Sequence, residues 1–256
     1  MRLTVLGSGT VSPSATRTSA SYWVESGGVR LLIDCGAGTL HRMATFGVDW
    51  FGTTHIALSH FHADHWGELP AFLFAQRWGA DTPRTGKLSL FGPRGLKPRI
   101  QALAQAFGQW ILSPGFPIEI VEIEPLERHE LGPGTFLECH RTRHTDESVA
   151  YSITDNDGRM VYTGDTGPSD DLAIWARGCD LLLSECSLPD DRAIDTHLTP
   201  AQAGRLARTA DAGRLVLTHF YPPVEAVDPV ARAAAEFERE VIAASDGDIF
   251  VIDGKR

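Results

Sequence analysis

Four side chains of types that bind metal ions lie within six positions of the sequence: His60, His62, Asp64 and His65. The apolar run 55–58 precedes them and predicts a strand, so the cluster is expected on a loop at the strand's end. Residues 60 and 62 project to the same side of an extended segment and can hold one divalent ion. Asp64 and His65 lie past the turn and can reach a second. Imidazole with carboxylate suits zinc, and also manganese or iron.

The alternative is a solvated polar loop, but four ligand-type residues in six positions favour metal binding. A pair of ions needs more ligands, and three candidates follow or separate other predicted strands: His144, Asp165 and His219. Each has an ordinary explanation when it is taken alone. Asp165 lies in a Gly-Asp-Thr-Gly turn, where aspartate is a common turn former, and an isolated histidine at a strand end is more often simply polar. Their occurrence together with the cluster favours a shared metal centre.

The elements that must position these residues are short β-type runs that alternate with turns and helices. Predicted strands cover 3–6, 22–24, 29–33, 55–58, 88–91, 118–123, 136–139, 149–153, 160–163, 181–183, 215–217 and 249–252. Predicted helices cover 38–46, 68–77, 97–107, 199–210 and 229–244. Thr199 and Gln202 have the residue types of an N-cap with a capping box. Two sheets with helices outside both give an αββα sandwich, and the absence of a linker-like stretch predicts one domain over 1–256.

The order of the ligand candidates resembles that of the metallo-β-lactamase superfamily, and the likeness covers essentially the whole chain. The resemblance implies the superfamily's four-layer αββα sandwich, of the α/β (α+β) class, and two divalent metal ions, Zn²⁺ first, with Mn²⁺ or Fe²⁺ as alternatives. It implies these ligands: His60, His62 and His144 for the first ion, Asp64, His65 and His219 for the second, and Asp165 as the bridge. An aspartate instead of a cysteine at position 165 argues against an antibiotic-hydrolysing β-lactamase and for the two-metal hydrolases.

Within the superfamily, the N-terminal third resembles ribonuclease Z and its smaller phosphodiesterase relatives. The segments that carry this likeness are 6–10, Pro13, Arg17, Ser19 and 32–39. Two later loops agree, one with Glu185 after a strand and one with His197 before a helix. The resemblance implies that His197, held by Glu185, donates a proton to the leaving oxygen or stabilises the phosphorane. Asp64, Glu185 and His197 are therefore the expected catalytic residues, although either of the last two could instead be an ordinary surface residue.

Two departures from ribonuclease Z bear on the substrate. That family inserts a long arm that grips tRNA, whereas only residues 145–164 separate His144 from Asp165 here. The basic Pro-x-Lys-x-Arg-Asn type of loop is also missing, and the formal net charge is -10. Because phosphate contacts supply most of a protein's affinity for nucleic acid, these losses weaken tRNA binding.

The expected function is therefore hydrolysis of a small or short phosphodiester, such as a cyclic nucleotide, by a hydroxide that bridges the two ions. One alternative is a tRNA 3′-end processing endoribonuclease that lacks the arm and acts on an RNA 3′ end. Another is a lactonase or thioester hydrolase, and a third is a nonenzymatic metal-binding protein. For substrate contacts, Arg17 either binds a phosphate or braces its loop, and Phe220 either stacks on a base or belongs to a proline-stiffened turn.

Composition limits the setting in which the protein works. The four cysteines show no CxxC spacing and are expected to be reduced thiols. The sequence begins without the basic and apolar segments of a signal peptide, and no apolar run approaches the roughly 20 residues that a bilayer requires, so a cytoplasmic location without membrane contact is expected. Aromatic residues at positions 72, 74 and 78 belong to the core or to an interface, and a homodimer is expected.

Overall fold

The strands form two seven-stranded sheets in the computed structural model, which describes residues 1–254. The first sheet has the order β14-β1-β2-β3-β4-β5-β6. Its strands are β1 (Arg2–Gly7), β2 (Ser21–Ser26), β3 (Val29–Ile33), β4 (His55–Ala57), β5 (Leu88–Gly92), β6 (Ile118–Glu122) and β14 (Ile249–Val251). Strands β3 to β6 run parallel to one another, so their carboxyl ends lie at one edge of the sheet.

The second sheet has the order β13-β12-β11-β10-β9-β8-β7. Its strands are β7 (Arg128–Gly132), β8 (Thr135–Arg141), β9 (Val149–Thr154), β10 (Arg159–Tyr162), β11 (Leu181–Glu185), β12 (Leu215–Thr218) and β13 (Val241–Ala243). Strands β10 to β13 are parallel, and β9 is antiparallel to β10. The segment that connects β8 to β9 therefore lies at the edge where β10, β11 and β12 end.

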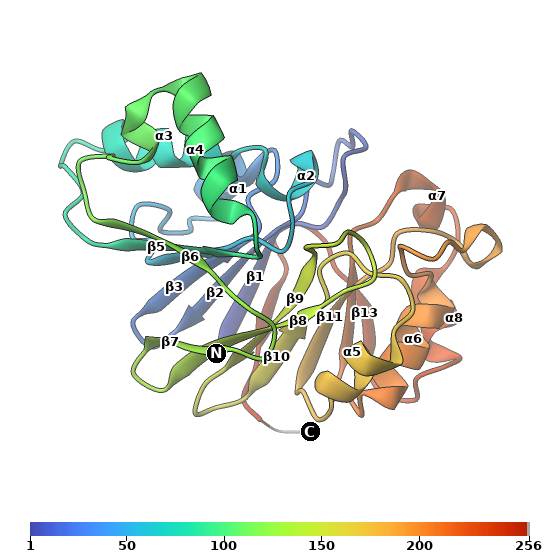
Figure 1. Cartoon of the computed structure of the whole chain (residues 1–256). Helices are drawn as coiled ribbons and strands as arrows, with labels where there is room; N and C mark the ends of the chain where they lie inside the picture. Colours follow the sequence, from blue (N-terminus) through green and yellow to red (C-terminus); the bar gives the residue numbers. More distant parts are fainter. Residues whose placement is uncertain (255–256) are drawn as a thin grey trace.

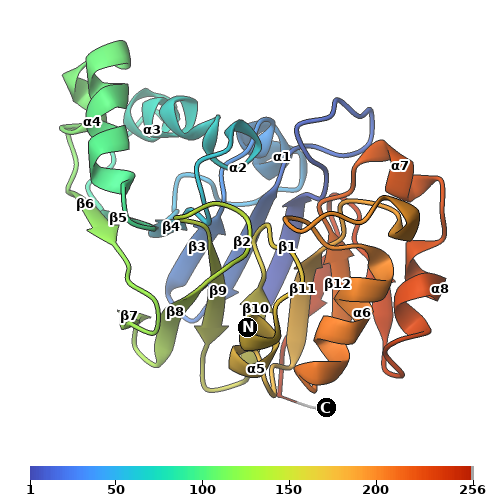
Figure 2. The same cartoon turned by 45° about the vertical axis from the view of Figure 1, so that its right-hand side comes forward.

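Helices cover the outer face of each sheet (Figures 1 and 2). On the first side lie α1 (Thr39–Thr45), α2 (Ala63–Trp66), α3 (Leu69–Trp78), α4 (Leu96–Phe107) and the 3-10 turn η1 (Gln109–Ile111). On the second side lie α5 (Asp170–Trp175), η2 (Asp190–Arg192), α6 (Pro200–Thr209), α7 (Pro222–Glu225) and α8 (Pro229–Ala234). One apolar core fills the space between the sheets, and two more lie beneath the helices. This is the four-layer αββα sandwich that was predicted.

Local sequence signals explain several of these elements. Thr199 accepts a hydrogen bond from the Gln202 backbone amide while the Gln202 side chain reaches back to Thr199, so the predicted capping box at α6 is confirmed. Strand β5 is buried at every position, which is typical of a parallel strand covered on both faces. All four cysteines are buried free thiols. No helix in the described part of the chain is long and apolar enough to cross a membrane.

The prediction of one helix over 229–244 is wrong. Helix α8 ends at Ala234, and the chain then forms β13, which pairs with β12. The alanine-rich composition favoured a continuous helix, but Phe237 is buried in the core beneath the helices and the β-branched residues Val241 and Ile242 fit a sheet edge. The structure also contains β7 and α5, which were not predicted; Ser169 caps α5 by accepting a hydrogen bond from the Leu172 amide.

Candidate metal centre

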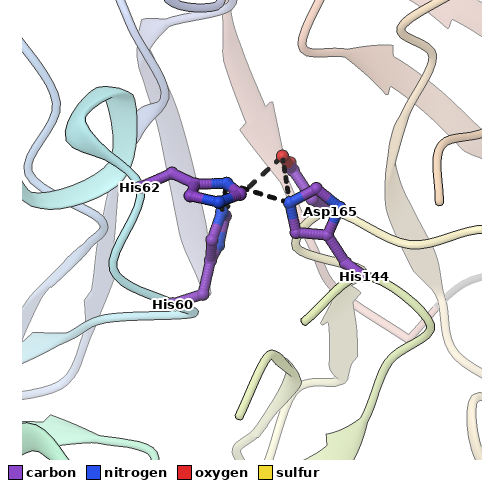
Figure 3. A group of neighbouring side chains, drawn as sticks. All are labelled: His60, His62, His144 and Asp165. Carbon is purple, nitrogen blue, oxygen red and sulfur yellow. Dashed lines mark hydrogen bonds and ion pairs between the residues drawn. The ribbon is translucent and has the colours of Figure 1, made fainter. Parts of the chain in front are cut away.

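Three histidines and one aspartate converge at the edge where the parallel strands end. His60 and His62 follow β4, whereas His144 and Asp165 come from loops of the second sheet (Figure 3). The Nδ1 atom of His62 lies 3.1 Å from His60 Nε2 and 3.0 Å from His144 Nε2. Asp165 Oδ2 lies 3.7 Å from His60 Nε2 and 3.6 Å from His144 Nε2. Four ligand-type atoms from the two sheets thus surround one point.

A second group of ligand-type side chains lies beside the first. His65 Nε2 lies 3.2 Å from His219 Nε2, and Asp64 Oδ2 lies 3.5 Å from His219 Nε2 and 4.0 Å from His65 Nε2. Asp165 faces this group with its other oxygen, since Oδ1 is 3.4 Å from the Nε2 atoms of both His65 and His219. One carboxylate therefore offers one oxygen to each group.

These distances fit divalent metal ions. Ligands about 2.0–2.1 Å from a tetrahedral ion lie roughly 3.3 Å from one another, and the spacings in the two groups range from 3.0 to 4.0 Å around this value. Asp165 Oδ1 is buried and has no hydrogen-bond partner among the described residues. Burial by itself raises the pKa of Asp165, but the neighbouring His219 and His65 outweigh this effect and hold the pKa well below its usual range. The Asp165 carboxylate is thus ionised and lies between two groups of imidazole rings.

Backbone geometry directs Asp165 into the centre. Gly164 has φ 57, and a Cβ atom at this position would lie 2.8 Å from the Val149 carbonyl oxygen. Only glycine fits both the left-handed conformation and the close approach of the neighbouring strand. Steric constraints in the turn between β10 and α5 therefore explain why glycine precedes Asp165.

Asp34 is the most important residue that the sequence reasoning missed. It is fully buried at the end of β3, and its Oδ2 atom lies 2.8 Å from His65 Nδ1. The same carboxylate accepts hydrogen bonds from the Ser59 amide, the Ser59 hydroxyl and the Tyr162 hydroxyl. A carboxylate behind a histidine ligand fixes the orientation of the ring and increases its basicity. Asp34 lies in the segment 32–39, and the likeness of that segment to ribonuclease Z was the sequence signal that could have identified this residue.

Other histidines of the centre are held in the same manner. His219 Nδ1 lies 2.9 Å from the Ser187 hydroxyl, and His144 Nδ1 lies 3.0 Å from the Thr196 carbonyl oxygen. Both contacts leave the Nε2 atom directed at the neighbouring ligand candidates. The ring orientations are therefore set by groups that are distant in sequence.

Replacement of Asp34 by alanine is expected to weaken metal binding by about 10- to 100-fold and to lower the free energy of unfolding by about 2 kcal/mol or more. The alanine leaves buried donors on Ser59 and Tyr162 without an acceptor and also strains position 34, where φ is 55. Metal titration by calorimetry and thermal unfolding measure both effects. Asp34→Asn is the matched variant, because asparagine keeps one acceptor oxygen and tolerates positive φ, and its loss should be smaller. Metal affinity unchanged in Asp34→Ala would contradict this role.

Glu185 and His197 form a pair next to the two groups. Glu185 is fully buried at the end of β11, and its Oε1 atom lies 2.9 Å from His197 Nδ1. The Thr166 and Leu198 amides donate hydrogen bonds to the same carboxylate. Burial lowers the pKa of His197, but Glu185 outweighs this effect and the pKa is raised. His197 also lies with Asp165 and His219 in a group whose ligand atoms are all within 4.8 Å of one another.

The two substrate contacts expected from the sequence are placed differently. Arg17 donates to the Ser8 hydroxyl and the Ala244 carbonyl and pairs with Glu225, so its guanidinium braces the loop. Of the two roles considered for Phe220, its burial favours the proline-stiffened turn over base stacking, because the ring is only 4% exposed and is packed beneath Arg17. The next residue, Tyr221, lies with its ring centroid 6.0 Å from that of His219.

Comparisons with known proteins find relatives over most of the chain. A model of the beta-lactamase superfamily domain matches residues 29–220. The uncharacterized protein ML1173 of Mycobacterium leprae is 34% identical over 98% of this chain and 89% of its own length. A ribonuclease Z of Mycobacterium sp. strain KMS is 30% identical over 94% of this chain and 92% of its own length.

Two solved structures share the fold. The metallo-beta-lactamase fold protein YhfI from Bacillus subtilis superimposes with a TM-score of 0.84 and 26% identity, covering 97% of this chain and 98% of its own. The short form of human tRNase Z gives a TM-score of 0.80 at 24% identity, covering 98% of this chain and 99% of its own.

Proposed function

Because the chain belongs to the beta-lactamase superfamily and is a metal-dependent hydrolase of that fold, we propose that it is a phosphodiesterase with two metal ions that acts on a small or short phosphodiester, such as a cyclic nucleotide. The observation that carries this proposal is the Glu185–His197 pair, which lies beside Asp165, the carboxylate that offers one oxygen to each group of histidines. A proton donor next to two ligand groups suits expulsion of an alkoxide from phosphorus.

In this proposal His60, His62 and His144 hold one ion, and Asp64, His65 and His219 hold the other, with Asp165 shared between them. We propose zinc, with manganese and iron as alternatives, because imidazole and carboxylate suit all three. Two such ions, when bound, would supply the positive charge that polarises the phosphate and activates the attacking water.

The proposed role of His197 is to protonate the leaving oxygen. Glu185 engages Nδ1 of the ring, which leaves Nε2 to face a substrate. Since Glu185 raises the pKa of His197, the ring is protonated in a larger fraction of the molecules near neutral pH. Buried amides in turn hold Glu185 in place, so the carboxylate acts as a positioning residue for the donor.

Small size of the substrate is supported by charge and by loop length. The net charge of -10 opposes binding of long polyanions, and residues 145–164 leave little room for a tRNA-gripping arm. The alternative of a tRNA 3′-end endoribonuclease is favoured by relatives that carry the name ribonuclease Z. Incubation with precursor tRNA distinguishes the two proposed substrates. Accurate release of the 3′ trailer would show that the substrate is RNA and not a small diester. A lactonase or thioester hydrolase is a further alternative, which the leaving-group experiment in the Discussion addresses.

Removal of the metal ions is expected to abolish hydrolysis of bis(p-nitrophenyl) phosphate and to lower the melting temperature by about 5 °C or more. The clustered imidazoles and carboxylates lose their shared cations, and ligand binding to the folded state no longer stabilises it. Activity is followed by release of p-nitrophenolate, and metal content is measured in the same sample before and after treatment with a chelator. Chelator already saturated with calcium is the control. Full turnover in metal-free protein would overturn the proposal.

Three further expectations remain proposals. Residues 1–256 are proposed to form one domain, and a cytoplasmic location is proposed. A homodimer is proposed because Phe74 and Trp78 are about half exposed and line an apolar hollow of about 550 Å³ with Phe107 and Trp110.

A further inference from the structure

A hollow of about 400 Å³ lies at the carboxyl end of β5, and residues on both sides of His144 in the sequence line it. Its charged lining consists of Arg94, Arg99, Arg141, Glu124, Asp146 and Glu147. Strand β5 pairs in parallel with β4, which leads to His60, and the loop 142–148 contains His144. The hollow and the candidate ligands thus share the edge at which parallel strands present binding groups.

Direct contacts connect the hollow to the loop that contains His60 and His62. The Arg99 guanidinium lies 4.0 Å from the ring centroid of Phe61, the residue between those two histidines. Val149, which lines the hollow, donates its amide hydrogen to the Ser59 carbonyl at 3.0 Å. The hollow therefore borders the segment that contains His60 and His62.

The arginines differ in how many donors they have left. Arg99 is committed, because it pairs with Glu147 at 3.1 Å and donates to the Gly95 carbonyl. Arg141 makes one bond, from Nη1 to the Asp146 carbonyl at 2.7 Å, and keeps its other N–H groups. The Arg94 side chain is exposed and has no hydrogen bond or ion pair among residues 1–254.

The carboxylates set a limit on what can bind. Three acids balance three arginines around the hollow, so its net charge does not attract a long polyanion. A single phosphate can nevertheless use the unoccupied N–H donors of Arg94 and Arg141, because the planar guanidinium matches phosphate oxygens in pairs. The hollow therefore binds a phosphate through individual N–H donors and not through a positive net charge.

We propose that this hollow is a subsite for a second phosphate group of the substrate, bound by Arg94 and Arg141 while the scissile diester lies at the metal centre. The inference rests on the proposed phosphodiesterase function and names its substrate class. That class is a short nucleotide diester that carries a terminal phosphate monoester. Within the proposed range of small or short phosphodiesters, the subsite favours short linear diesters over a simple cyclic diester, which carries only the scissile phosphate.

The experiment compares thymidine dinucleotides with a phosphate at the 5′ end, at the 3′ end or at neither end, using the metal-loaded protein. One phosphorylated form is expected to exceed the unphosphorylated form in kcat/KM by about tenfold, the effect of one good charge-assisted contact. Arg94→Glu and the double variant Arg94→Ala/Arg141→Ala are expected to remove most of this preference. Arg177→Glu is the matched control, because Arg177 is exposed, also lacks a side-chain partner among residues 1–254 and precedes β11 at the opposite edge.

Two outcomes separate the subsite from the function on which it rests. Equal kcat/KM for all three dinucleotides, or a preference that survives in both arginine variants, overturns the subsite and leaves the phosphodiesterase intact. Failure to cleave any diester, bis(p-nitrophenyl) phosphate included, overturns the proposed function. A binding measurement is independent of turnover: inorganic phosphate titrated into chelator-treated protein should shift the Nε–Hε resonances of Arg94 and Arg141 more than that of Arg177. Equal shifts at the three arginines also contradict the subsite.

Discussion

Replacement of Asp165 by alanine is expected to lower phosphodiester turnover by about 10³-fold or more. The side chain is 3% exposed and places one oxygen within 3.7 Å of the His60 and His144 Nε2 atoms and the other 3.4 Å from those of His65 and His219. Its loss removes a ligand from both groups and the anion that balances their shared charge. Asp165→Asn keeps the shape without the charge, so a large loss in this variant as well assigns the effect to the carboxylate and not to packing.

The readout is metal content together with activity. Wild-type protein should bind two ions per chain, whereas Asp165→Ala should bind fewer and more weakly in a calorimetric titration. Asp81→Asn is the control, because Asp81 is exposed and its side chain has no hydrogen bond or ion pair among residues 1–254. An Asp165→Ala variant that holds two tight ions and retains turnover within tenfold of wild type would show that the bridge is not needed.

Replacement of His197 by alanine is expected to act according to the leaving group. For a diester that releases an alkoxide, the loss should reach about 10²- to 10⁴-fold, because an alkoxide requires a proton as it departs. For bis(p-nitrophenyl) phosphate the loss should be much smaller, since p-nitrophenolate leaves without help. Glu185→Gln should lower turnover of the alkoxide-releasing diester, relative to that of bis(p-nitrophenyl) phosphate, less than His197→Ala does. Glutamine keeps a polar contact with the His197 ring but loses the charge that raises the pKa of His197.

The pattern over the two substrates distinguishes the possible roles. An equal fall with both substrates, accompanied by loss of an ion, would make His197 a ligand, as its position within 4.8 Å of the Asp165 and His219 ligand atoms allows. Unchanged activity with both would favour the lactonase or thioester hydrolase alternative, whose chemistry does not need the pair. His41→Ala is the control for a general effect of removing a histidine, since His41 is exposed on α1.

Local sequence was sufficient wherever the interacting residues are neighbours along the chain. The grouping of the side chains from His60 to His65 could be predicted because these residues are adjacent in the sequence and follow the end of a strand. The capping box of α6 is another example, since Thr199 and Gln202 are three residues apart. The more distant candidates, such as His219, needed the order of a whole family as a guide.

Contacts between remote segments could only be known from the tertiary structure. Asp34 supports His65 from the end of β3, and the spacing of the two residues in the sequence does not indicate this hydrogen bond. In the same way, Phe220 is covered by Arg17, and residues 241–243 form a strand because β12 offers an unpaired edge that outweighs local helix propensity. Sequence by itself therefore determined which chemical groups this protein has and which elements hold them. Packing of the two sheets decided which groups face the centre, because burial and long-range hydrogen bonds depend on neighbours that sequence spacing does not reveal.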